Sequence, residues 1–200
     1  FPSLRYDLLS DTPGPRSLKV WSPGLGANLA LDGERLFVRA RISRGFRAPT
    51  FNQRYWLEGG NPDLHPEFSD AYDAGLGASV IDRVLHLEAS VFLHDIVDKI
   101  VWMPGAGVFW SPKNIQHVLS QGVELRLHGA TPGGLFRYRA NGQVLSTKKM
   151  NQSFVGDATE GRQLPYTPAY SGGAVLDGVF GDLGVSLSLH VVGPRYTLET

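Results

Sequence analysis

Apolar and polar side chains alternate along most of this chain with a period of two. Every second residue is apolar in residues 36–43, 72–80, 85–93, 123–128 and 185–191, and the residues between them include arginine, glutamate, histidine, serine and glycine. Such alternation is typical of β-strands with two different faces, because successive side chains of a strand point to opposite sides. No stretch of useful length has a helical period. The pattern therefore predicts an all-β protein.

The alternation divides the chain into nine predicted strands, several of them longer than the about five or six residues usual in globular proteins. The predicted strands are residues 1–9, 17–31, 35–44, 67–80, 84–100, 113–129, 135–147, 165–179 and 183–195. Glycine and proline cluster between them, where turns belong. Tight turns at 32–34, 81–83, 131–134 and 181–182 alternate with longer predicted loops near 45–66, 102–112 and 148–163.

A soluble sandwich and a membrane barrel both contain strands with one apolar and one polar face. Three features favour the barrel. The strands reach the about 9–11 residues that cross a bilayer at a tilt. Short and long connections alternate, as periplasmic turns and extracellular loops do, and the apolar face of the alternating runs carries no charge. Aromatic residues near strand ends fit interfacial girdles; they are Tyr6, Phe46, Tyr72, Trp102, Trp110, Tyr166 and Tyr196.

Composition narrows the function classes. Lysine plus arginine and aspartate plus glutamate both number 19, so the formal net charge is zero and no electrostatic case for nucleic acid exists. The absence of cysteine excludes disulfides, thiolate metal sites and a cysteine nucleophile. No run approaches the about 18 apolar residues of a membrane-spanning helix. The chain starts at Phe1, so we expect that a leader has been removed or that the chain is cut from a longer one.

One segment carries the most specific motif. Residues 43–56 read SRGFRAPTFNQRYW, and residues 60–76 read GNPDLHPEFSDAYDAGL. The segment resembles the paired motif of TonB-dependent outer-membrane receptors, in which a strand ends in a Phe-Arg-Ala-Pro stretch and the chain returns from a long outer loop through Asn-Pro-x-Leu-x-Pro-Glu. The matching residues are Phe46, Arg47, Ala48, Pro49, Asn61, Pro62, Leu64, Pro66 and Glu67.

Further fragments resemble the same family in the same order along the chain. They are Leu4–Asp7, Ser22–Gly26, Phe92–Ile100, Asn114–Ile115, Gly122–Leu125 and Gly193–Tyr196. The layout is nearest to the cobalamin-receptor and colicin-receptor branch.

The resemblance implies an incomplete antiparallel up-and-down transmembrane β-barrel. Such transporters close with about 22 strands around a plugged lumen, so residues 1–200 are expected to be a partial barrel domain without its plug and final strands. It further implies a Gram-negative outer-membrane location, contact with outer-membrane lipid, and uptake of a small-molecule or metal-chelate ligand such as a ferric siderophore, haem or cobalamin. Energy would come from the TonB complex through a plug upstream of Phe1, without a cofactor and without enzymatic chemistry.

The predicted loops hold the candidate ligand-binding residues. Prolines 49, 62 and 66 lack the amide donor of a strand ladder and mark where pairing stops. A loop stiffened in this way can present aromatic and polar side chains to a bulky, partly polar ligand. The candidates are Arg47, Gln53, Arg54, Tyr55, Trp56, Trp102, Phe109 and Trp110. Alternatively, the aromatic residues form an interfacial girdle, and Arg47 and Glu67 cap strands and pair with neighbours.

No catalytic or metal-binding constellation stands out in the sequence. Asp95 and Asp98 lie beside Lys99, and a solvated ion pair is the simplest interpretation. His86 and His94 are eight residues apart, about 26 Å along a strand, so these two cannot share a metal. Two other function classes stay open: a passive pore or structural and adhesive barrel, and a soluble β-sandwich binding module or carbohydrate-active enzyme.

Overall fold

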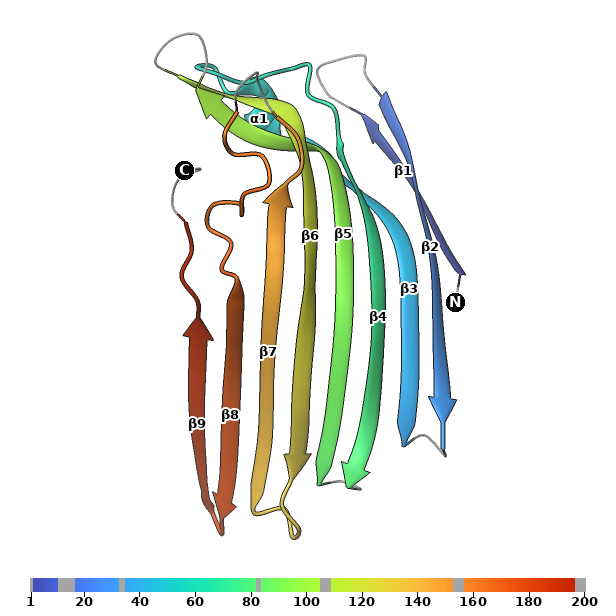
Figure 1. Cartoon of the computed structure of the whole chain (residues 1–200), viewed down its shortest axis with the longest axis vertical. Coiled ribbons are helices and arrows are strands. Elements are labelled where there is room, and N and C mark those ends of the chain that lie inside the picture. Colours follow the sequence, from blue (N-terminus) through green and yellow to red (C-terminus); the bar gives the residue numbers. More distant parts are fainter. Residues whose placement is uncertain are drawn as a thin grey trace.

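The computed structural model describes residues 2–10, 17–32, 35–81, 84–104, 109–152 and 157–196. These residues form nine strands and one short helix (Figure 1). The elements are β1 (Pro2–Ser10), β2 (Ser17–Leu31), β3 (Leu36–Arg47), α1 (Phe51–Tyr55), β4 (Glu67–Ile81), β5 (Leu85–Pro104), β6 (Trp110–Ala130), β7 (Phe136–Lys149), β8 (Tyr170–Phe180) and β9 (Leu183–Val192).

All nine strands belong to one antiparallel sheet in which each strand pairs with its neighbours in sequence. The sheet curves like a section of a barrel wall, with short turns at one end and longer connections and α1 at the other (Figure 1). Left-handed backbone at Gly133, Gly134 and Gly181 makes two of the short turns tight, and Asp32, directly after β2, is left-handed as well. The predicted up-and-down topology is confirmed for the described strands.

The two faces of the sheet differ as the alternation predicts. On one face, large apolar side chains such as Val38, Leu76 and Val123 are exposed. On the other face, charged side chains pair across strands: Arg39 lies 3.5 Å from Glu88, and Arg139 lies 3.7 Å from Asp177. The wall therefore has no interior of its own, and its apolar residues face outward.

The buried residues gather instead at the end of the sheet that bears the long connections, which we call the loop end. Apart from Val20, the buried apolar residues Leu64, Ile100, Val118 and Leu164 all lie there. Buried polar residues lie there as well; among the described residues they are Gln53, Glu67, Gln116, Thr147, Lys149 and Asp157. Folded connections thus build a small core over one edge of the wall.

Several predicted boundaries are wrong at the loop end. The predicted loop 102–112 is mostly strand, because β5 continues to Pro104 and β6 begins at Trp110. Residues 165–169 precede β8, and β9 ends at Val192. The helix α1 was not predicted either, because it is a single turn fixed by capping and too short to show a period. No helix of the described ranges is long and apolar enough to span a membrane.

Candidate functional site

The connection between β3 and β4, residues 48–66, folds into a compact unit that we call the ledge. Thr50 begins α1 with a capping box: its side chain accepts a hydrogen bond from Gln53 N at 3.2 Å, and the Gln53 side chain accepts one from Thr50 N at 2.9 Å. Two amides that a helix start leaves unpaired are satisfied in this way. Asn61 N then donates to Gln53 O at 2.9 Å, which folds the rest of the ledge back onto α1.

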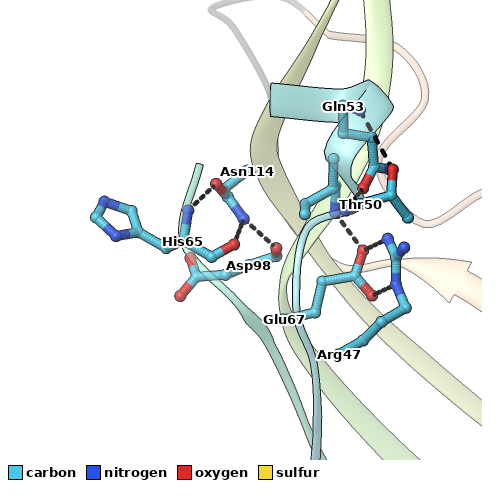
Figure 2. Close-up of polar contacts among 8 residues, drawn as sticks. Arg47, Thr50, Gln53, His65, Glu67, Asp98 and Asn114 are labelled. Carbon is cyan, nitrogen blue, oxygen red and sulfur yellow. Dashed lines mark hydrogen bonds and ion pairs between the residues drawn. The ribbon is translucent and has the colours of Figure 1, made fainter. Parts of the chain in front are cut away.

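An ion pair joins the two ends of the ledge. Arg47 and Glu67 are register partners at the last positions of β3 and β4, and their side chains form a two-pronged hydrogen-bonded pair with Arg47 Nε 2.9 Å from Glu67 Oε2 (Figure 2). The same carboxylate accepts a hydrogen bond from Ile100 N at 2.7 Å. Glu67 thus connects β3, β4 and β5 at one point.

Lys99 adds a second cation beside this pair. It lies on β5 past the last β4 pairing at Val97, outside the part of the sheet that β3 and β4 share. The pKa of the Lys99 ammonium is lower than its usual value, chiefly because of burial. The Glu67 carboxylate raises this pKa, and the Arg47 guanidinium lowers it. The ledge base therefore holds two cations around one buried carboxylate.

Asn114 fastens the ledge to the extended β5–β6 hairpin. Its side-chain oxygen accepts from His65 N at 2.9 Å, and its amide donates to His65 O at 2.9 Å and Asp98 O at 2.7 Å (Figure 2). Asn61 also donates to Pro112 O at 3.0 Å. Asp98 lies in a β-bulge and has a left-handed φ of 56°, which turns its carbonyl toward Asn114.

The docked ledge brings aromatic side chains together. The rings of Trp56 and Trp102 meet edge to face with centroids 5.5 Å apart. Gly59 lies so close to the start of β6 that a Cβ there would collide with Trp110 O, so this contact requires glycine. Trp56, Phe109 and Trp110 are exposed. We call the side chains of Trp56, Trp102, Phe109 and Trp110 the aromatic platform.

The structure separates the predicted ligand-binding residues into two groups. Arg47 is paired with Glu67, Gln53 is buried in the capping box, and Arg54 Nη2 donates to Leu64 O at 3.1 Å. These three build the ledge. Tyr55 packs on Phe51 at 4.9 Å. Trp102 and Trp110 lie in strands rather than in the predicted loop, and a ligand-binding role for the aromatic platform stays a prediction.

A second ion pair, which was not predicted, holds the connection between β7 and β8. We call the Arg47–Glu67 pair the first latch and this pair the second latch. The Lys149 ammonium pairs with the Asp157 carboxylate and donates to Thr159 Oγ1 at 2.8 Å, and both charged side chains are almost fully buried. Leu164 N donates to Thr147 O at 2.8 Å, so the segment continues along β7. Lys149 was missed because it follows another lysine at a strand end, where a solvated charge is the usual interpretation.

The titratable groups elsewhere in the described ranges form no metal centre of three or more ligands. Asp95 bonds to His117 on the next strand, so the partner of this carboxylate is a histidine and not the predicted Lys99. His86 contacts His128 with ring centroids 4.6 Å apart and ring planes tilted by 41°, and His94 lies 4.0 Å from Asp73. These contacts cross strands, so spacing within one strand could not reveal them.

A family model matches the chain over nearly its whole length, and individual relatives match parts of it. The family described as TonB dependent receptor-like, β-barrel, matches residues 2–199. A vitamin B12 transporter BtuB of Vibrio vulnificus (strain YJ016) is 33% identical over 138 residues, 68% of this chain and 21% of that protein. The BtuB of Photobacterium profundum is 35% identical over 100 residues, 48% of this chain and 16% of that protein. The matched part spans about a fifth of these relatives.

Solved structures share the fold. The copper transporter OprC superposes with a TM-score of 0.72 at 18% identity, covering 92% of this chain and 28% of that one. The ferric yersiniabactin uptake receptor FyuA of Yersinia pestis gives 0.67 at 21% identity, covering 92% and 27%. The family match agrees with the sheet, its exposed apolar face, and the Phe-Arg-Ala-Pro and Asn-Pro-x-Leu-x-Pro-Glu stretches that border the ledge. This chain therefore belongs to the β-barrel family of TonB-dependent receptors.

Proposed function

We propose that this chain forms part of the wall and mouth of an outer-membrane receptor for the energised uptake of a scarce nutrient. The observation that carries the proposal is the Trp56–Trp102 contact, which the docked ledge holds at the loop end. Rigid aromatic side chains bind bulky ligands at low entropic cost. Together with Phe109 and Trp110, Trp56 offers exposed apolar area at the same end of the sheet as the cations of the ledge base, Arg47 and Lys99.

The ligand we propose is a cobalamin, a ferric siderophore or haem. All three are large, partly polar and rich in conjugated or apolar surface, which suits an aromatic platform. The names of the relatives support this class, since they include vitamin B12 transporters and a ferric yersiniabactin receptor. The receptor itself performs no covalent chemistry in this proposal.

The complete receptor would contain more than these nine strands. Barrels that enclose a plug need about 22 strands, so we propose that this chain is one section of the wall. A plug outside this section would pass energy from TonB to the bound ligand. Residues Arg47, Gln53 and Arg54 then serve the ligand indirectly, by holding the ledge in place.

Binding to the complete receptor tests the aromatic platform. We expect Trp56→Ala to weaken the binding of the transported ligand at least tenfold, since aromatic anchors commonly contribute about 2 kcal/mol or more. Trp21→Ala is the matched control, because Trp21 is also exposed but lies on β2 and contacts Tyr6. Affinity is measured by titration with cyanocobalamin, haem and a ferric catecholate. Equal losses in both variants for every ligand would overturn the role of the platform.

Energy dependence separates receptor from passive pore. Uptake of radiolabelled ligand should stop in cells that lack TonB, and a pore would continue to admit it. A passive pore gives no reason for a connection that Asn114 and the Arg47–Glu67 pair hold in place.

A further inference from the structure

The face of the wall that carries the cross-strand ion pairs, which we call the polar face, is hollowed between β1, β2 and β3. The hollow has a volume of about 430 Å³, within the range of small-ligand sites. Gly24 lies at its centre, and a Cβ there would be only 2.6 Å from Ser3 Oγ. The side chains around it belong to Ser3, Arg5, Ser22, Arg41 and Ser43, and Gly45 leaves its upper end open.

The hollow holds hydrogen-bond donors that the wall itself does not use. Elsewhere on the polar face, arginines such as Arg39 and Arg139 lie within 4 Å of a carboxylate. The register partner of Arg41 is Asp73, but this carboxylate lies 4.0 Å from His94. Within the described ranges, no side-chain partner is found for the Arg41 guanidinium. The same holds, over those residues, for the hydroxyls of Ser22 and Ser43.

The donors and the charge of the hollow suit an oxyanion. None of the residues that line it is acidic, and the nearby Asp7 carboxylate already accepts the Arg5 guanidinium at 2.7 Å. A guanidinium binds a carboxylate or phosphate through two parallel hydrogen bonds, and serine hydroxyls can donate to the remaining oxygens. The hollow therefore offers one unpaired cation and two hydroxyls to the same anion.

The hollow lies below the ledge. Gly45 is two residues before Arg47 on the same face of β3, so the first latch is its neighbour toward the loop end. Ser43 lies in the same register row as His94, and Trp102 of the aromatic platform follows His94 by eight residues along β5. A ligand that enters from the loop end meets the platform first and the hollow afterwards.

We infer that this hollow is a second binding site, which takes a carboxylate or phosphate group of the transported ligand after the ligand leaves the aromatic platform. The Arg41 guanidinium holds the group, and the Ser22 and Ser43 hydroxyls donate to it. The inference rests on the proposed function, because it requires a ligand that passes along the polar face. It adds a chemical group and a site apart from the platform.

Two variants of the complete receptor test the site. Arg41→Gln removes the charge and keeps a hydrogen-bonding side chain. Gly45→Val fills the hollow without a clash, because a Cβ at Gly45 meets nothing within 4 Å, and valine suits a strand. The matched controls lie on the same face outside the hollow: Arg39→Gln on the same strand, and Gly184→Val, where a Cβ also meets nothing within 4 Å.

Binding of small anions to the purified receptor gives the first readout. Saturation-transfer NMR of citrate and ³¹P line broadening of inorganic phosphate both detect weak binding. We expect Arg41→Gln to weaken the binding of each anion about fivefold, the upper end for an exposed ion pair at about 1.4 kcal/mol per factor of ten. Gly45→Val should weaken it at least as much, and the two controls should bind as the unmodified receptor does.

Uptake by cells that carry the complete receptor gives the second readout. Cyanocobalamin contains a phosphate group and haem contains carboxylates, whereas a ferric catecholate can be chosen that has neither. For cyanocobalamin or haem, Arg41→Gln should slow uptake about fivefold and leave the equilibrium affinity within about twofold, because the platform is intact. Uptake of the catecholate should not change.

Equal anion binding by Arg41→Gln and the unmodified receptor, or binding of neither anion to the unmodified receptor, would overturn the site. Weakened anion binding with unchanged uptake would show a site for free anions only and would overturn its role in transport. A receptor that transports the catecholate alone would overturn it too. If Trp56→Ala leaves ligand affinity unchanged while Arg41→Gln weakens anion binding, the aromatic platform fails and the anion site remains.

Discussion

Two ion pairs hold connections at the loop end, and they differ in their surroundings. The Arg47–Glu67 pair joins two neighbouring strands, and its side chains are 47% and 11% exposed. The Lys149–Asp157 pair ties a connection back onto its own strand, and its side chains are 3% and 1% exposed. The first pair has water on one side and a backbone amide on the other. The second pair is shielded from water, so its charges are stabilised by each other and by Thr159.

That difference shows how similar chemistry serves two purposes. A buried charge loses its hydration, so removing its partner leaves an uncompensated charge. A half-exposed charge regains water when its partner leaves. The second latch should therefore carry stability, whereas the first mainly sets the position of the ledge and the register of β3, β4 and β5.

The largest expected effect comes from the buried latch. Lys149→Ala in the complete receptor should lower the free energy of unfolding by about 3–5 kcal/mol, because Asp157 is left buried without its cation. Urea unfolding in micelles, followed by tryptophan fluorescence, measures the change. The double variant Lys149→Met with Asp157→Leu should recover most of the loss, since no charge is then buried. A loss below about 1 kcal/mol in the single variant would show that the pair is not a latch.

An intermediate loss of unfolding free energy is expected at the ledge base. Glu67→Ala should cost about 2 kcal/mol, because it removes charged hydrogen bonds to Arg47 and leaves the buried Ile100 amide unpaired. Glu67→Gln should cost less, since its amide oxygen still accepts from Ile100. The same unfolding measurement applies, with ligand affinity as a second readout. If Glu67→Gln were as damaging as Glu67→Ala, the charge rather than the amide contact would hold the ledge.

The smallest effect is expected in the wall. Arg39 and Glu88 are 3.5 Å apart, and the arginine is 42% exposed. Arg39→Gln should change the free energy of unfolding by less than about 1 kcal/mol, as exposed pairs generally do. A loss comparable to that of Lys149→Ala would remove the distinction between wall and latches.

The strands β2, β4 and β7 could be predicted closely, because alternation is a local property of the chain. The ledge was predicted only in outline: Pro49, Pro62 and Pro66 showed where pairing stops, and pairing of Arg47 and Glu67 with neighbours was one interpretation of the motif. The extension of β5 and β6 was not predicted. The alternation of β5 breaks at the bulge around Lys99, and β6 includes Pro112, although proline is rare in strand ladders.

The order of residues along the chain was enough to establish the strand class, the up-and-down order, the apolar and polar faces, and a motif that resembles one family. Each of these follows from residues close together in the chain or from the direction of successive side chains. The meeting of distant residues became visible only in the folded molecule: Asn114 with His65, Trp56 with Trp102, and Lys149 with Asp157. The physical reason is register. Cross-strand neighbours depend on how strands pair, and a shift of one residue would move every side chain to the opposite face.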